Sequence, residues 1–123
     1  MRSLLGDRVR KHDIVFYPSG RIDISAHAAR QIGLSPGDVV DIVTERGEYY
    51  LYVRIRKPLC GRFEAQVYRD NRRSRRLRTN SQKLRKALLG ESGNADVIRL
   101  CVGKPVQDDR FGILLPIVTN LHL

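Results

Sequence analysis

The chain has 123 residues, of which 41% are apolar and 29% are charged, and its formal net charge is +10. This length suits one domain, or two small halves that share a core. The sequence has no run of about 18 apolar residues such as a membrane helix needs, and its first residues lack the apolar stretch of a signal peptide. We therefore expect a soluble, cytoplasmic protein with no membrane partner.

The first half, residues 13–56, follows a polar, basic arm at residues 1–12. Alternating or continuous β-branched and apolar residues, separated by turn signals, predict four strands. These strands cover residues 13–18, 21–24, 39–43 and 48–55. Between the second and third strands, Ser25 is a suitable N-cap for a short helix that Gly33 would end.

The second half, residues 62–120, begins after a joint at residues 57–61 and repeats the order of the first. Its predicted strands cover residues 62–68, 76–79, 97–102 and 112–118. Asn80-Ser81 can cap a helix through Leu89, which would bury Leu84, Ala87 and Leu88. This repetition is one of pattern more than of residue identity.

Each helix is too short to be stable alone, because nucleation is costly, so both must pack against a sheet. Two halves that cover each other would also remove exposed strand edges. The sequence therefore predicts a mainly β protein with two short helices. Its architecture would be a small β-barrel built from two strand-strand-helix-strand-strand halves.

Residues 69–86 form the most unusual segment, with nine Lys or Arg residues against one Asp. Such a charge density favours a nucleic-acid partner, and Arg suits both phosphate and the guanine edge. On a strand, Arg76 and Arg78 would share one face, and the basic residues of the following helix would reach flanking phosphates. The alternative is a solvated, mobile hairpin that only keeps the protein soluble.

Residues 20–42 resemble the AbrB/MazE/SpoVT-like DNA-binding domain: a Gly-Arg strand, a short helix that ends in Gly-Leu, a Pro-Gly-Asp turn and an alternating strand. The resemblance covers residues 13–55, with a divergent second copy at 62–119. It implies a swapped-hairpin or double-psi β-barrel, usually made by two chains, that grips DNA with basic side chains. Arg21 and Arg30 match basic positions of the family, whereas Asp23 departs from its pattern.

The favoured function is therefore a DNA-binding transcriptional regulator or antitoxin-like factor that grips duplex DNA through an Arg-rich hairpin. The resemblance also implies a homodimer. The candidate contacts are Arg21, Arg30, Arg69, Arg72, Arg73, Arg75, Arg76, Arg78, Lys83, Arg85 and Lys86. One alternative is an RNA- or single-strand-binding module with tyrosine faces exposed. Another is a protein that docks an acidic partner.

No motif for catalysis, metal or cofactor binding is found in the sequence, so we expect no enzyme, no cofactor and no small-molecule substrate. Cys60 and Cys101 have no metal-ligand spacing. We expect two buried thiols there, with a disulfide as the alternative.

Overall fold

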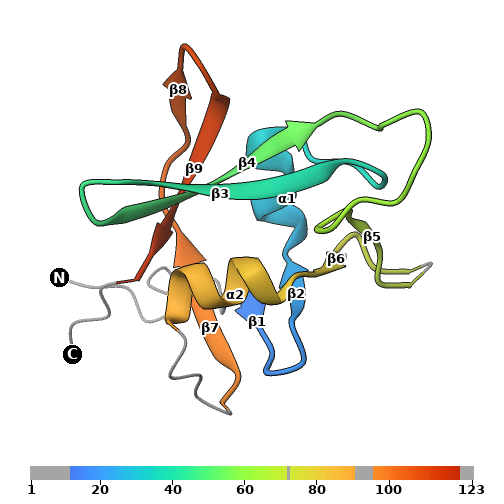
Figure 1. Cartoon of the computed structure of the whole chain (residues 1–123), viewed down its shortest axis with the longest axis horizontal. Coiled ribbons are helices and arrows are strands. Elements are labelled where there is room, and N and C mark those ends of the chain that lie inside the picture. The colour runs from blue at the N-terminus through green and yellow to red at the C-terminus, as the bar shows by residue number, and fades with distance from the viewer. Residues whose placement is uncertain (1–11, 72, 91–95, 120–123) are drawn as a thin grey trace, which may run out of the picture.

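The computed structural model describes residues 12–71, 73–90 and 96–119, so the arm predicted at residues 1–12 lies almost entirely outside the described residues. The strands are β1 (Ile14–Phe16), β2 (Arg21–Ile24), β3 (Val39–Glu45), β4 (Glu48–Ile55), β5 (Tyr68–Arg69), β6 (Leu77–Asn80), β7 (Ile98–Val102), β8 (Val106–Asp108) and β9 (Gly112–Val118). The helices are α1 (Ala26–Ile32) and α2 (Gln82–Leu89). The expectation of a mainly β chain with two short helices is confirmed (Figure 1).

The strands form a curled antiparallel sheet in the order β3-β4-β9-β7-β1-β2-β6-β5, with β8 paired to β9. The two ends of this path are themselves joined. Val39 bridges Gln66, just before β5, and backbone hydrogen bonds run from Gly37 to Val67 and from Val67 to Asp38. The sheet is therefore barrel-like, with few unpaired edges.

The strand pairing is symmetric under exchange of the two halves. If β1, β2, β3 and β4 are exchanged with β5, β6, β7 and β9, the order of pairs along the sheet is kept, and the pair of β1 with β7 corresponds to the bridge of Val39 with Gln66, just before β5. The central pairs, β2 with β6 and β4 with β9, map onto themselves. Each helix also follows the second strand of its half. The predicted boundaries between the halves stay an interpretation, which this symmetry supports.

The core lies on the inner face of the curled sheet, where alternate strand residues point inward. Ile14, Phe16, Ile24 and Leu115 are each at most 1% exposed. The buried face of α1, at Ala28, Ala29 and Ile32, belongs to the same cluster as these strand residues. The helix is short, and this burial is what stabilises it.

The turn after α1 is fixed by a buried carboxylate. Gly37 has a φ of 98°, as the third position of a type II turn requires, and Asp38 donates its amide to Ser35. The Asp38 carboxylate accepts hydrogen bonds from the amides of Ser35 and Lys57 and from Arg56. It thus ties the start of β3 to the end of β4.

Both helices begin at a serine whose hydroxyl makes two hydrogen bonds. Ser25 accepts from Ala28 N and donates to Asp13; Ser81 accepts from Leu84 N at 3.1 Å and donates to Glu64 at 2.6 Å. The capping serines expected from the sequence are confirmed.

We expect Ser81→Ala to lower the free energy of unfolding by about 1 kcal/mol, because the Leu84 amide loses its acceptor at the start of α2. Urea denaturation measures this loss. Ser35→Ala serves as the control, since the Ser35 hydroxyl makes no hydrogen bond with any described residue. Equal stabilities of the two variants would contradict the capping role.

The second half departs from prediction in several places. Residues 62–68 were expected as a strand, but only Tyr68–Arg69 is one, because Ala65 takes a φ of 64° that breaks the extended backbone. Strand β8 was not predicted.

Cys60 is exposed and Cys101 half-buried, and both are free thiols, so the prediction of two buried thiols is wrong.

On α2, Ala87 is exposed and Arg85 is buried, which reverses their predicted places. The buried stripe runs along Leu84, Arg85 and Leu88. The aliphatic stem of an arginine can cover apolar surface, so the stripe includes position 85.

Candidate nucleic-acid interface

The loop between β5 and β6 is held by short-range hydrogen bonds. The Asn71 side chain accepts from the amides of Arg73 and Ser74 at 2.9 and 2.8 Å, and Ser74 Oγ accepts from Arg76 N at 3.0 Å. Asp70 N donates to Arg76 O across the base of the loop. The described part of this basic loop is therefore a structured turn.

Two of the predicted contact arginines in this hairpin bind carboxylates of their own chain. Arg76 donates twice to Asp70, at 3.1 and 2.7 Å. Arg78 donates to Asp23 at 2.8 and 3.3 Å and also lies 3.0 Å from Asp70. The prediction that Arg76 and Arg78 share a face fits this arrangement, since both reach Asp70, but their guanidinium charges are partly neutralised.

Arg21 belongs to the same group of charges. It lies 3.3 Å from Asp23, and its guanidinium stacks on the Tyr17 ring at 3.8 Å. Asp23, which departs from the family pattern, is only 2% exposed and faces Arg78 directly across the β2–β6 pair. The acid therefore does not present a negative charge to a ligand; it anchors two arginines on the outer face of the sheet.

These contacts shift the pKa of two groups. The hydrogen bond from Arg76, aided by the charge of Arg78, lowers the pKa of the Asp70 carboxyl. The hydrogen bond to Asp23 raises the pKa of Arg78 still further above its usual range. Both shifts favour the charged forms, as hydrogen bonds to charged groups do.

The pKa of Asp70 leads to a prediction about acid stability. Its folded-state pKa lies below the ordinary 3.8, so the carboxylate contributes stability above about pH 4. That contribution is lost as the pH falls through the lowered pKa. We expect the thermal midpoint of Asp70→Asn to fall less steeply than that of the wild type between about pH 4, just above the ordinary pKa, and about pH 2, well below it. Parallel curves for the two proteins would show that the Arg76 pairing is not formed.

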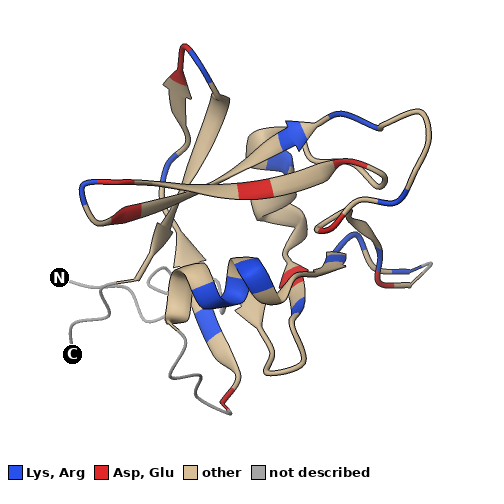
Figure 2. Cartoon of the chain, viewed as in Figure 1, with Lys and Arg blue, Asp and Glu red and all other residues tan. Residues whose placement is uncertain are grey.

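Five of the basic residues predicted to contact nucleic acid remain available to bind a ligand. Their side chains are exposed and make no hydrogen bond or ion pair with any described residue. They are Arg69, Arg73, Arg75, Lys83 and Lys86. Figure 2 shows Lys and Arg following one another along the β5–β6 hairpin and on α2. The chain therefore keeps a surplus of positive charge in this region after its internal pairing.

Three other predicted contacts have different outcomes. Arg30 is exposed on α1 and also makes no side-chain ion pair within the described part of the chain. Arg72 lies outside the described residues. Arg85 is 4% exposed, so the expectation that it reaches a flanking phosphate is wrong.

The tyrosines of β4 offer little to a stacked base. Tyr52 is 8% exposed and packs edge-on against Phe111, and burial raises its pKa. Tyr50 is half-buried and donates its hydroxyl to Glu48. Tyr49 is half-buried and packs against the core. This arrangement does not favour a stacking platform on β4.

Sequence reasoning did not identify Asp23 and Asp70 as partners of the basic residues. The sequence offered a signal for Asp70 alone, because this residue stands within the basic run, whereas Asp23 is 55 residues from Arg78.

Within the described ranges, no group of His, Cys, Asp and Glu side chains is arranged to hold a metal ion.

Within residues 12–71, 73–90 and 96–119, no helix has the length and apolar character needed to cross a membrane. Comparisons with protein-family models, curated proteins and solved structures found no match to this chain.

Proposed function

We propose that this chain binds duplex DNA through the exposed cations of the β5–β6 hairpin and α2. The observation that carries the proposal is that Arg69, Arg73, Arg75, Lys83 and Lys86 keep their charges unpaired within the described structure, although two carboxylates lie nearby. Unpaired cations on a structured surface gain free energy by releasing counterions from a phosphate backbone.

We further propose that the barrel is of the swapped-hairpin or double-psi type of the AbrB/MazE/SpoVT-like domains. The support is the resemblance of residues 20–42 and the exchange symmetry of the strand pairing, by which one chain would supply both units of the barrel. A transcriptional regulator or antitoxin-like factor fits this proposal, and a homodimer would present two such surfaces.

The experiment is a competition for a fluorescently labelled random DNA duplex, followed by anisotropy. Unlabelled duplex DNA should displace it at lower nucleotide concentration than single-stranded DNA or RNA of the same length. A lower effective concentration of RNA or single-stranded DNA would contradict the proposal and favour the single-strand alternative. Failure to bind any of these polyanions would leave the docking of an acidic protein partner.

A further inference from the structure

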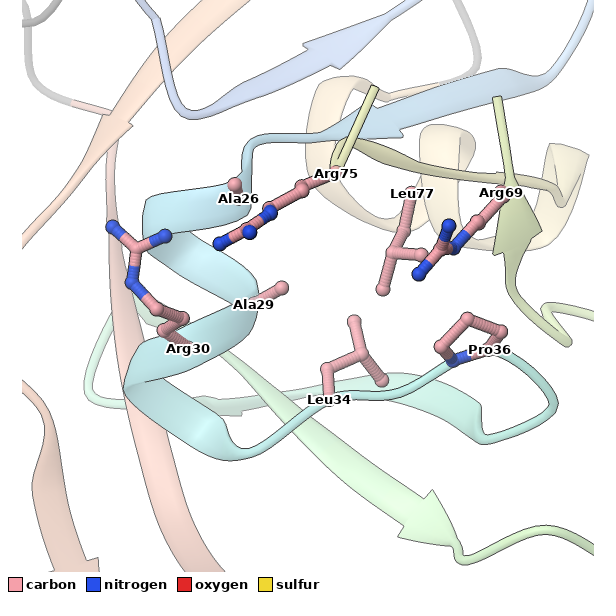
Figure 3. A pocket seen from close by; sticks show the side chains of 8 residues that line it. All are labelled: Ala26, Ala29, Arg30, Leu34, Pro36, Arg69, Arg75 and Leu77. Carbon is pink, nitrogen blue, oxygen red and sulfur yellow. The ribbon is translucent and has the colours of Figure 1, made fainter. Parts of the chain in front are cut away.

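A hollow beside α1 combines an apolar floor with arginines from three different elements. Its volume is about 290 Å³, close to the lower limit of about 300 Å³ for ligand pockets. Arg30 comes from α1, Arg69 from β5, and Arg75 from the loop before β6. Figure 3 shows Arg75 extending over α1 beside Ala26.

The floor of this hollow is apolar and rigid. It includes Ala29, Leu34 and Leu77, which are between 3 and 7% exposed and belong to the hydrophobic core cluster. Ala26 and Pro36 also line the hollow and keep accessible apolar surface above this floor. An apolar group gains free energy by covering such surface, whereas a solvated phosphate backbone does not. Pockets for small molecules pair apolar walls with a few charged groups in this way.

The charges around the hollow all have one sign. The side chains that line it include three arginines and no acidic residue. The guanidinium groups of Arg30, Arg69 and Arg75 make no ion pair with any described residue. Elsewhere in the hairpin, arginines are paired with Asp23 and Asp70, so the absence of a carboxylate here leaves the positive charge for a ligand.

We propose that this hollow binds a small organic anion in which a phosphate or carboxylate group is attached to an apolar body. The anionic group lies between the guanidinium groups, which suit planar, two-point hydrogen bonding. The apolar body lies against Ala26 and Pro36, above the buried floor of Leu34 and Leu77. Because Arg69 and Arg75 also belong to the proposed DNA surface, a bound anion would weaken duplex binding; this last consequence alone rests on the proposed function.

The test is calorimetric titration of the DNA-free protein with three probes: phenyl phosphate, inorganic phosphate and benzyl alcohol. Phenyl phosphate should bind at least tenfold more tightly than either of the others. It is the one probe that can both accept hydrogen bonds from the arginines and cover the apolar lining. Inorganic phosphate binding as tightly as phenyl phosphate would overturn the proposal, since the apolar floor would then contribute nothing.

Two variants and one control localise the binding. Arg30→Gln should weaken phenyl phosphate roughly tenfold or more, as expected for the loss of a charged hydrogen bond. Ala26→Leu should fill the hollow and abolish the preference for phenyl phosphate while leaving inorganic phosphate unaffected. Arg99→Gln removes an exposed charge outside the lining and should change nothing. An equal loss for Arg30→Gln and Arg99→Gln would refute the site.

The result separates the two proposals. Because the titration contains no DNA, binding of phenyl phosphate without any duplex binding would refute the proposed function and leave the pocket standing. Duplex binding without a preference for phenyl phosphate would refute the pocket and leave the proposed function standing.

Discussion

Replacing Asp23 with alanine is expected to lower the free energy of unfolding by about 3 kcal/mol, a large part of the roughly 5–15 kcal/mol that stabilises a domain. The Asp23 carboxylate is 2% exposed and accepts hydrogen bonds from Arg78 and Arg21. Without it, Asp70 is the one carboxylate among the described residues that still pairs with the Arg78 guanidinium. Because Arg78 is 21% exposed, water offsets part of the loss, which places the effect at the low end for a broken buried pair.

Urea denaturation measures the effect, and Glu45→Ala is the matched control. Glu45 is an exposed strand carboxylate without an ion pair to any described residue, so its loss should cost less than about 0.5 kcal/mol. The double variant Asp23→Leu with Arg78→Met should recover most of the stability, because the more buried arginine is removed together with its carboxylate. Arg21 also loses Asp23, but its side chain is 36% exposed to water and keeps its stacking on Tyr17. If Asp23→Ala were as stable as Glu45→Ala, the carboxylate would not be anchoring the arginines.

Neutralising four of the exposed cations should nearly abolish duplex binding. The variant carries Arg73→Gln, Arg75→Gln, Lys83→Gln and Lys86→Gln. Each phosphate contact contributes about 0.9 to the slope of log K against log salt, and at about 0.1 M salt this equals about 0.9 in log K. The loss of four contacts should therefore raise the dissociation constant on the order of 10³-fold. These side chains are exposed, and the fold should be unaffected.

The control has the same loss of charge at other places. It carries Arg46→Gln, Arg99→Gln, Lys104→Gln and Arg110→Gln, all of them exposed positions outside the hairpin and α2. Its affinity should fall much less, since only the long-range field changes. Equal losses for the two variants would mean that net charge, and not this surface, attracts the duplex.

The secondary structure of the first half could be predicted from the sequence because its signals are local. Alternation marked β2, and Ser25 and Gly33 marked the ends of α1, whose capping hydroxyl and left-handed glycine are in the expected places. The Pro-Gly turn before β3 required only a positive φ at Gly37. Such features depend on residues within one or two turns of each other, so tertiary structure rarely overrides them.

The sequence predicted the candidate site less well, because strand register determines which of its arginines pair with a carboxylate. Arg78 faces Asp23 only because β2 and β6 pair, and no local pattern predicts that pairing. The burial of Arg85 likewise depends on how α2 is rotated against the sheet. Counting charges along the chain therefore identified the basic region but did not separate paired arginines from available ones.

The salt dependence of duplex affinity tests the central proposal most directly. For the wild type, log K should fall against log salt with a slope of about −4 to −5, as expected for about five phosphate contacts. In the variant that lacks the charges of Arg73, Arg75, Lys83 and Lys86, the slope should become shallower by about 3 to 4 units. A slope that is the same for both proteins would contradict the proposal that these side chains contact phosphates.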